Sequence, residues 1–178
     1  MSLANLTLCV RDSVEADVAA IQAIYAHHVL HGAASFELTP PTVDEMRQRR
    51  ADVVAKALPY LVAEQNGVVV GYAYVTLYRP RPAYRFTVED SVYVQEGLSG
   101  QGIGSLLLAE IIQICTAKGY RQMMAVVGDS SLPSVSLHEQ HGFTLAGTFK
   151  AVGYKFGAWR DTAMLQRALG EGDQTDPI

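Results

Sequence analysis

The sequence predicts an α/β domain built around a mixed sheet, and three observations carry this prediction. Segments with apolar residues at helical spacing alternate with runs rich in β-branched residues. Two such runs meet at an Asn66-Gly67 dipeptide, which is typical of a hairpin turn. Hydrophobic residues make up 49% of the 178 residues, enough for one buried core. We therefore expect a single domain over 1–178, with an ordered core over about 6–169 and a polar tail over 170–178.

The first third of the chain predicts a strand followed by two helices. Residues 6–11 form the first expected strand, and Asp12-Ser13 supplies an N-cap for a helix over 14–31. The apolar residues of that helix recur every three or four positions: Val18, Ile21, Ile24, Tyr25 and Val29. A shorter helix is expected over 44–57, because Pro40-Pro41 ends the segment before it.

The middle of the chain predicts the hairpin and one further strand. Residues 61–64 and 68–77 are the two arms of the hairpin. Residues 87–94 form the next strand, and a glycine-rich segment over 97–104 follows it directly.

The last part of the chain predicts two more helices and three strands. The helix over 103–118 is apolar on most of its surface and should be largely buried, and a buried strand follows over 123–127. Ser131 can cap a short helix that extends to about residue 141. Residues 143–146 and 162–167 are expected to form late strands.

Charge and cysteine content narrow the classes of function. The net charge is −4 and the chain shows no basic stripe, so we expect no nucleic-acid partner. No apolar run approaches the roughly 18 residues of a membrane span, and residues 1–4 lack the basic start of a signal peptide. Cys9 and Cys115 are too few for a disulfide framework or a metal knuckle. We therefore expect a reduced, cytoplasmic protein.

The segment over 92–105 is the most informative for chemistry, because a strand leads through a glycine-rich turn into a helix. Glycines let a ligand approach the main chain, and the first amides of a helix form an anion site that suits a pyrophosphate. A helix-entry loop without a ligand is the alternative. A nucleotide P-loop is disfavoured because no lysine precedes Ser105. A dinucleotide fingerprint is disfavoured because its third glycine is missing and the segment follows a hairpin.

Here the chain resembles the GNAT superfamily of N-acetyltransferases. Their pyrophosphate loop has the pattern Gln/Arg-x-x-Gly-x-Gly/Ala after a strand, and this sequence has Ser99-Gly100-Gln101-Gly102-Ile103-Gly104. Both glycines match. Ser99 departs from the pattern, which leaves the backbone amides as the cradle for the phosphates.

Three further segments resemble the phosphinothricin and methionine-sulfoximine acetyltransferases of that superfamily: residues 79–94, 133–143 and 153–161. Together the matches extend over most of the chain. The resemblance implies a mixed, mostly antiparallel sheet flanked by helices, acetyl-CoA as acyl donor, a small-molecule amine as acceptor and a homodimer.

The resemblance also implies which residues hold the cofactor. The pantetheine arm is expected to pair with a strand backbone, helix-entry amides to hold the phosphates, and an N–H near Val94 to stabilise the oxyanion. The residues expected to bind the cofactor are Val92, Tyr93, Val94, Gly100, Gln101, Gly102, Ile103, Gly104, Ser105 and Ser131. Ser131 stands where the family often has an asparagine.

Glu89 and His138 align with the catalytic positions of the family. A carboxylate in a partly dehydrated cleft can take the ammonium proton of the acceptor, and an imidazole can protonate the departing thiolate. Glu89 can instead be a surface residue, pair with an arginine or only orient the amine. His138 can be a structural residue, with a tyrosine as the acid.

Other side chains are candidates for the acceptor pocket. Phe36 and Tyr78 resemble lining positions, and Arg79 and Arg81 can grip a substrate carboxylate, although they can equally form a solvated edge. His27 and His31 have the spacing of a metal pair but no carboxylate at ligand spacing, so we predict no metal site. Lys155 with Tyr154 and Trp159 is expected to serve packing or a dimer interface.

The leading hypothesis is an acetyl-CoA-dependent enzyme that acetylates an amino-acid-like amine, such as L-phosphinothricin or methionine sulfoximine, by direct transfer with Glu89 as general base. The same chemistry on a polyamine, an aminoglycoside or a protein N-terminus is one alternative. A non-catalytic module that binds acyl-CoA is the other.

Overall fold

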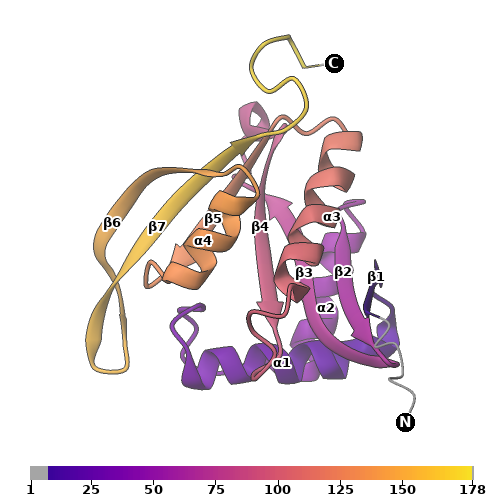
Figure 1. The fold of residues 1–178 in the computed structure, drawn as a ribbon, viewed down its shortest axis with the longest axis vertical. Helices are drawn as coiled ribbons and strands as arrows, with labels where there is room; N and C mark the ends of the chain where they lie inside the picture. The colour runs from indigo at the N-terminus through magenta and orange to yellow at the C-terminus, as the bar shows by residue number, and fades with distance from the viewer. Residues whose placement is uncertain (1–7, 178) are drawn as a thin grey trace.

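A computed structural model describes residues 8–177 and shows one seven-stranded sheet in the order β1-β2-β3-β4-β5-β7-β6 (Figure 1). Within it, β4 and β5 pair in parallel and every other neighbouring pair is antiparallel. The strands are β1 (Leu8–Asp12), β2 (Tyr60–Gln65), β3 (Val68–Leu77), β4 (Thr87–Val94), β5 (Gln122–Gly128), β6 (Thr144–Lys155) and β7 (Ala158–Ala168). The predicted mixed, mostly antiparallel sheet is confirmed.

Helices cover both faces of the sheet. They are α1 (Val18–His31), α2 (Val43–Val54), α3 (Ile103–Ala117) and α4 (Leu132–Gln140), with single 3-10 turns over Glu15–Asp17 and Pro82–Tyr84. The side chains of α3 that reach the sheet are fully buried, among them Leu107, Leu108 and Ile111. No described helix is long and apolar enough to cross a membrane.

The first helix begins later than predicted but ends at His31 as predicted, and the second helix, predicted over 44–57, begins one residue and ends three residues earlier. α1 starts at Val18 because the Asp17 carboxylate accepts a hydrogen bond from the Val14 N–H and pairs with Arg11, which holds a separate 3-10 turn. α2 starts after Thr42, whose hydroxyl accepts from the Glu45 N–H while the Glu45 carboxylate accepts from the Thr42 N–H. The start of the first predicted strand lies outside the described residues.

The late strands are much longer than predicted. β6 and β7 form a hairpin that turns at Phe156-Gly157, where both residues have positive φ (53° and 71°). The alternation of buried and exposed residues that predicts a strand is missing in β6, because nearly all of this edge strand is exposed. Ser131 occupies the N-cap of α4 as predicted, but its side chain makes no capping hydrogen bond.

The polar tail contacts the end of the sheet. Arg121 donates to the carbonyls of Gly172 and Asp176 and to the Thr175 hydroxyl. These bonds hold the described part of the tail beside β5.

Candidate functional site

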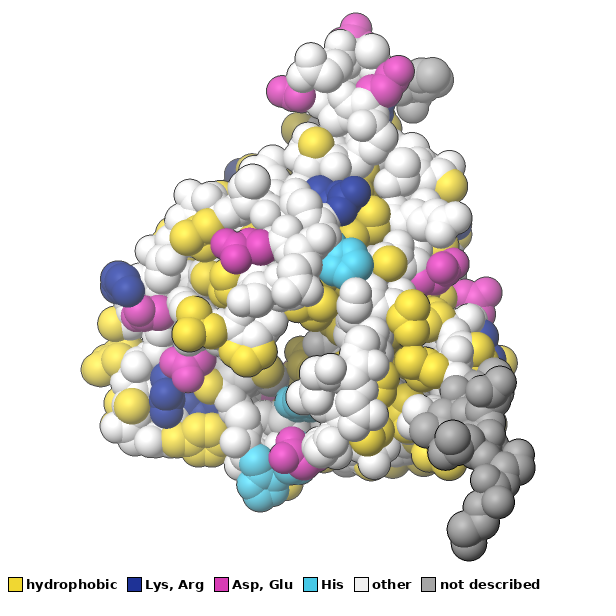
Figure 2. All heavy atoms as spheres, viewed as in Figure 1, with side chains coloured by type: hydrophobic (Ala, Val, Ile, Leu, Met, Phe, Trp, Pro, Cys, Tyr) yellow, Lys and Arg dark blue, Asp and Glu magenta, His cyan; other side chains and the backbone are white. Residues whose placement is uncertain are grey.

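A gap between β4 and β5 forms the centre of the candidate site. Their pairing ends at Asp90 and Ala125, after which the two strands separate. A cavity of about 60 Å³ opens in the gap, bounded by the two strands and by α4. Seen as in Figure 1, the surface of the molecule is hollowed near α4 and α3 (Figure 2).

The backbone of β4 offers unpaired groups to this gap. The Tyr78 N–H donates to the Thr87 carbonyl, and the Gln95 N–H donates to the Val70 carbonyl. These two bonds identify which facing residue pairs of β3 and β4 are hydrogen-bonded to each other. Since hydrogen-bonded and non-hydrogen-bonded pairs alternate along an antiparallel ladder, the N–H and C=O groups of Val92 and Val94 point away from β3, toward the gap. The Val94 carbonyl already accepts a hydrogen bond from His28 Nε2 at 2.8 Å, in the tautomer that protonates this nitrogen. The remaining three groups form a short strand edge that an extended amide chain can pair with.

The glycine-rich loop leads from this edge into α3. Gly102 has φ of 82° and occupies the N-cap, and Gly100 has φ of 78°. A side chain at either position would meet no atom within 4 Å, so the space in front of the loop is open. The first helical bond runs from the Leu106 N–H to the Gly102 carbonyl, which leaves the amides of the first turn free.

Two residues that are predicted to bind the phosphates also make contacts that hold α3 against α4. Gly104 lies so close to α4 that an added Cβ would be 3.3 Å from Leu137, so this glycine serves helix packing. The Ser105 hydroxyl lies 2.8 Å from His141 Nε2, which ties the start of α3 to the end of α4. Their backbone amides still belong to the open first turn.

Strand alternation sends neighbouring residues of β4 to opposite faces of the sheet. Val92 and Val94 lie beneath α3, where both contact the position of Gly104. Tyr93 faces α1, with its ring 5.1 Å from that of Tyr25. By the same alternation Glu89 lies on the α1–α2 face and Asp90 on the α3–α4 face. The site therefore has two sides, which meet at the gap.

Glu89 has the electrostatics of a proton acceptor. Burial raises the pKa of its carboxyl, and this effect outweighs the opposing attraction of Arg79, while the Asp90 charge adds to the rise. Within the described residues the carboxylate has no ion-pair partner within 4.0 Å. The alternative of a simple arginine pair therefore has no support in the described contacts.

His138 is buried on the other face, with 4% of its surface exposed. Its Nε2 lies 2.9 Å from Asp90 Oδ2, and its Nδ1 lies 2.7 Å from the Ser134 carbonyl. A carbonyl and a carboxylate are both acceptors, so this geometry favours an imidazole with a proton on each nitrogen and a positive charge. Burial opposes this charge, but the bond to Asp90 outweighs it and the pKa of His138 is raised. Asp90 was not predicted from the sequence.

The arginines before β4 lie at the edge of the α1–α2 face. The Arg79 guanidinium stacks 4.5 Å from the centre of the Tyr78 ring and is close enough to Glu89 to affect its pKa. Arg81 is exposed. Tyr78 also meets the Tyr84 ring edge-on at 5.7 Å, so these residues form one aromatic and cationic rim.

The loop between α1 and α2 is docked on the β6–β7 hairpin. The Phe36 ring packs so tightly on Gly153 that a Cβ there would overlap it. Lys155 is buried and donates to the Ser35 carbonyl at 2.6 Å, and burial lowers the pKa of its amine. Tyr154 and Trp159, predicted with Lys155 to serve packing or a dimer interface, are exposed, so the interface stays a prediction for them. Phe36 therefore joins this loop to β6, and its ring also packs on Gly128 at the end of β5.

The sequence analysis did not predict the contacts that three residues near the gap make. His28, Asp90 and Lys155 act through contacts with residues at least 48 positions away, which no local pattern indicates. Ser131 lies at the wall of the gap, and its contact with the cofactor stays a prediction. The described part of the chain holds no group of three His, Cys, Asp or Glu side chains arranged for a metal ion, and His27 contacts Glu96.

Comparison with known proteins gives consistent results. A family model described as an acetyltransferase (GNAT) domain matches residues 10–164. The chain is 52% identical to the phosphinothricin N-acetyltransferase of Alcaligenes faecalis over 178 residues, covering 99% of this chain and 90% of the relative. It is 40% identical to the L-methionine sulfoximine/L-methionine sulfone acetyltransferase of Salmonella typhimurium over 167 residues, covering 92% of this chain and 96% of the relative.

Solved structures agree with these sequence matches. A GNAT superfamily phosphinothricin acetyltransferase from Sinorhizobium meliloti, in complex with acetyl-CoA, superposes with a TM-score of 0.95 at 47% identity, covering 97% of this chain and 94% of the other. A putative acetyltransferase, yncA from Salmonella typhimurium with its cofactor acetyl-CoA, superposes with a TM-score of 0.91 at 35% identity, covering 97% and 99%.

Proposed function

Since this chain belongs to the GNAT family of N-acetyltransferases, which use acetyl-CoA as acyl donor, we propose that it acetylates a small amino-acid-like amine such as L-phosphinothricin or methionine sulfoximine. The predicted family, enzyme class and acyl donor are confirmed. One observation carries the proposal: an unpaired, half-buried Glu89 lies beside Arg79 on one side of the gap. The acceptors named for the relatives agree with it.

The residues of the gap fit the donor. The free N–H and C=O groups of Val92 would pair with the amides of the pantetheine arm, and the open amides around Gly102 would hold the phosphates. Acetyl-CoA supplies an activated acetyl group as a thioester. The Val94 N–H would stabilise the negative charge that develops on the carbonyl oxygen.

Glu89 would act as the general base on the acceptor side. An amine is a nucleophile only when it is neutral, so a group must remove the ammonium proton. The raised pKa of Glu89 makes it a better acceptor for this proton than an exposed carboxylate, directly or through a water.

Direct transfer to the amine needs no covalent enzyme intermediate. The serines that border the gap are Ser91, Ser131 and Ser134. His138 cannot serve them as a base, because a ring that donates to both Asp90 and the Ser134 carbonyl already carries a proton on each nitrogen. This arrangement supports direct transfer over a serine nucleophile.

His138 would supply the proton to the departing thiolate. The ring borders the gap from the face opposite Glu89, and its Nε2 proton would have to leave the hydrogen bond to Asp90 to reach the thiolate. In the step, the Nε2–H bond breaks, the S–H bond forms and the electron pair stays on the ring nitrogen. Base and acid thus serve the reaction from opposite sides of the sheet.

Arg79 and Arg81 would grip the acceptor carboxylate. A guanidinium binds a carboxylate through two parallel hydrogen bonds, and Arg79 lies on the same side as Glu89. A polyamine acceptor carries no carboxylate and would be repelled by these charges.

A homodimer and a cytoplasmic location are further parts of the proposal. The β6–β7 hairpin exposes large apolar side chains: Leu145, Phe149, Val152, Tyr154, Phe156 and Trp159. Such a cluster favours a protein partner, for which a second copy is the simplest choice. Sedimentation should give twice the 19.3 kDa chain mass. Both cysteines are free thiols, which agrees with a reducing compartment.

The test is acetyl-CoA turnover followed by free thiol release. The acceptors would be phosphinothricin, methionine sulfoximine, spermidine, kanamycin and a short peptide. We expect release with the first two, and release with another amine alone would replace the acceptor class. Binding of acetyl-CoA without release for any amine would favour the non-catalytic acyl-CoA module instead.

A further inference from the structure

Two adjacent histidines near the end of α1 hold the junction between β4 and the glycine-rich loop. The His28 Nε2 lies 2.8 Å from the Val94 carbonyl oxygen, and the His27 Nε2 lies 3.1 Å from the Glu96 carboxylate. The His28 ring also packs on the Tyr93 ring, with 5.4 Å between the ring centres. In Figure 1 the β4 arrow ends close to α1. His28 therefore contacts the strand where its free edge ends.

The peptide unit between Val94 and Gln95 is held at both of its ends. Its carbonyl accepts the hydrogen bond from His28, and its N–H donates to the Val70 carbonyl at 2.9 Å. A carbonyl that is engaged in this way is not available to a ligand unless the bond is broken. The cost of breaking such a bond corresponds to about fivefold in an equilibrium constant.

The engaged carbonyl limits how an extended chain can pair with this edge. A chain that adds to a strand pairs with the N–H and C=O of one residue, and the next residue that points the same way lies two positions further. Without His28, both Val92 and Val94 would offer such a pair of groups. The two pairing registers would differ by about 7 Å, because each residue of a strand rises about 3.4 Å. With the Val94 carbonyl engaged, only Val92 of these two residues offers both groups.

We propose that His28 is a positioning residue that sets the register of acetyl-CoA on β4. The proposal rests on the proposed donor site at the gap. By occupying the Val94 carbonyl, His28 confines the amides of the pantetheine arm to Val92 and leaves the Val94 N–H for the thioester oxygen. A donor in the other register would have its thioester displaced by about 7 Å along the strand. Such a donor would bind without reacting.

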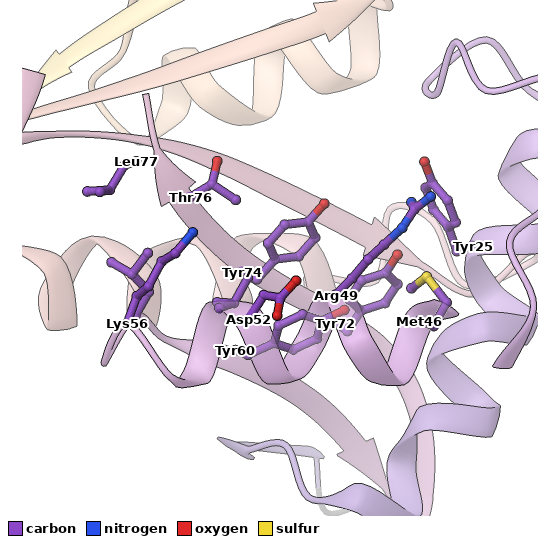
Figure 3. Close-up of a pocket in the computed structure, with 12 residues that line it drawn as sticks. Tyr25, Met46, Arg49, Asp52, Lys56, Tyr60, Tyr72, Tyr74, Thr76 and Leu77 are labelled. Carbon is purple, nitrogen blue, oxygen red and sulfur yellow. The ribbon is translucent and has the colours of Figure 1, made fainter. Parts of the chain in front are cut away.

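A separate cavity of about 250 Å³ lies on the same face of the sheet, and Figure 3 shows its lining side chains. The lining comes from α1, α2, β2, β3 and the segment between α2 and β2, with Tyr25 as the contribution of α1. The Tyr25 ring meets the Tyr93 ring edge-on, whereas His28 packs on Tyr93 and reaches the Val94 backbone. His28 is therefore assigned to the donor strand and not to this cavity.

The experiment compares acetyl transfer by the wild type, His28→Phe and His28→Gln at a saturating concentration of phosphinothricin. Phenylalanine keeps a ring against Tyr93 but has no donor, whereas the glutamine amide can donate in place of Nε2. In His28→Phe the two registers have similar strength, so about half of the bound donor is unreactive. We expect kcat and the KM for acetyl-CoA to fall together by about twofold, so that kcat/KM is unchanged.

Two further variants separate this role from simple packing. His28→Gln should keep the wild-type values, because it restores the donor without the ring. His31→Phe makes the same change at an exposed histidine further along α1, and this matched control should leave kcat and KM unchanged. A lower kcat/KM with a weaker affinity for acetyl-CoA in His28→Phe indicates a purely structural role and overturns the proposal. Wild-type kcat and KM in His28→Phe overturn it as well.

A second readout needs no turnover. NMR spectra of the protein with isotope-labelled valines would be recorded with coenzyme A, which carries the pantetheine arm but no acetyl group. In the wild type, coenzyme A should shift the amide signal of Val92 more than that of Val94, and in His28→Phe the two shifts should be similar. Similar shifts in the wild type overturn the proposal.

The same spectra distinguish the role of His28 from the proposals on which it depends. If neither valine signal shifts, the donor lies elsewhere, and the proposed donor site fails together with the role of His28. If phosphinothricin is not acetylated but the shifts differ between Val92 and Val94 as expected, the proposed acceptor fails and the role of His28 stands.

Discussion

The buried pair of Asp90 and His138 gives the sharpest prediction for stability. Asp90→Asn keeps the shape of the side chain but removes the negative charge that holds the imidazole charged. Removal of one partner of a buried ion pair costs about 3 kcal/mol or more. For a chain of this length, 1 kcal/mol corresponds to about 2–4 °C in Tm, so we expect a loss of about 6–12 °C at pH 6.

The pH dependence of this loss follows from the direction of the pKa shift. The folded-state pKa of His138 is raised, so the pair contributes its full stability below the ordinary pKa of histidine and loses it as the pH rises through the folded value. The Tm difference between wild type and Asp90→Asn should therefore shrink between pH 6 and pH 9.

The assay is thermal unfolding followed by fluorescence at several pH values. Asp173→Asn makes the same charge change in the exposed tail, where the carboxylate contacts only the neighbouring Gln174, and should leave Tm unchanged. A Tm loss for Asp90→Asn that stays constant from pH 6 to pH 9 would falsify the assignment of a charged His138.

Three further predictions concern the gap and its borders. Glu89→Gln should lower kcat at least about 100-fold, while calorimetry should show unchanged affinity for acetyl-CoA. The kcat/KM of the wild type should fall as the pH decreases through a pKa above the ordinary value for glutamate. A kcat/KM that does not change with pH contradicts the base role. Gly102→Ala forces a φ of 82° on an alanine, so acetyl-CoA should bind several-fold more weakly, and unchanged affinity excludes the loop as the cradle. Gly153→Ala should displace Phe36 and raise the acceptor KM more than that for acetyl-CoA, with Gly147→Ala as the open-space control.

Local patterns were sufficient to predict the elements that position the donor. The Asn66-Gly67 turn joins β2 and β3 as predicted, and β4 has the predicted bounds of 87–94. Both features depend on residues within a few positions of one another, namely positive φ at the turn and alternation along the strand. The open glycine loop before α3 follows from the same kind of information.

Features that depend on distant contacts were not predictable in this way. Asp90 follows Glu89 in the sequence, but its partner His138 lies 48 positions away, so no local pattern marks it. The length of the β6–β7 hairpin was underestimated because an exposed edge strand has no buried face to produce alternation. The role of Glu89 as base and that of His138 as acid stay predictions.

The hydrogen bond between the Lys155 amine and the Ser35 carbonyl joins residues 120 positions apart. It affects the order in which parts of the enzyme fold during synthesis. During synthesis the loop that carries Phe36 emerges early, but the strand on which it docks emerges among the last. Contacts this distant in sequence form late, because the chain between them must close first. A nascent chain that ends before β6 therefore lacks the strand on which the Phe36 loop docks. We expect acetyl transfer to begin only after the C-terminal hairpin has left the ribosome.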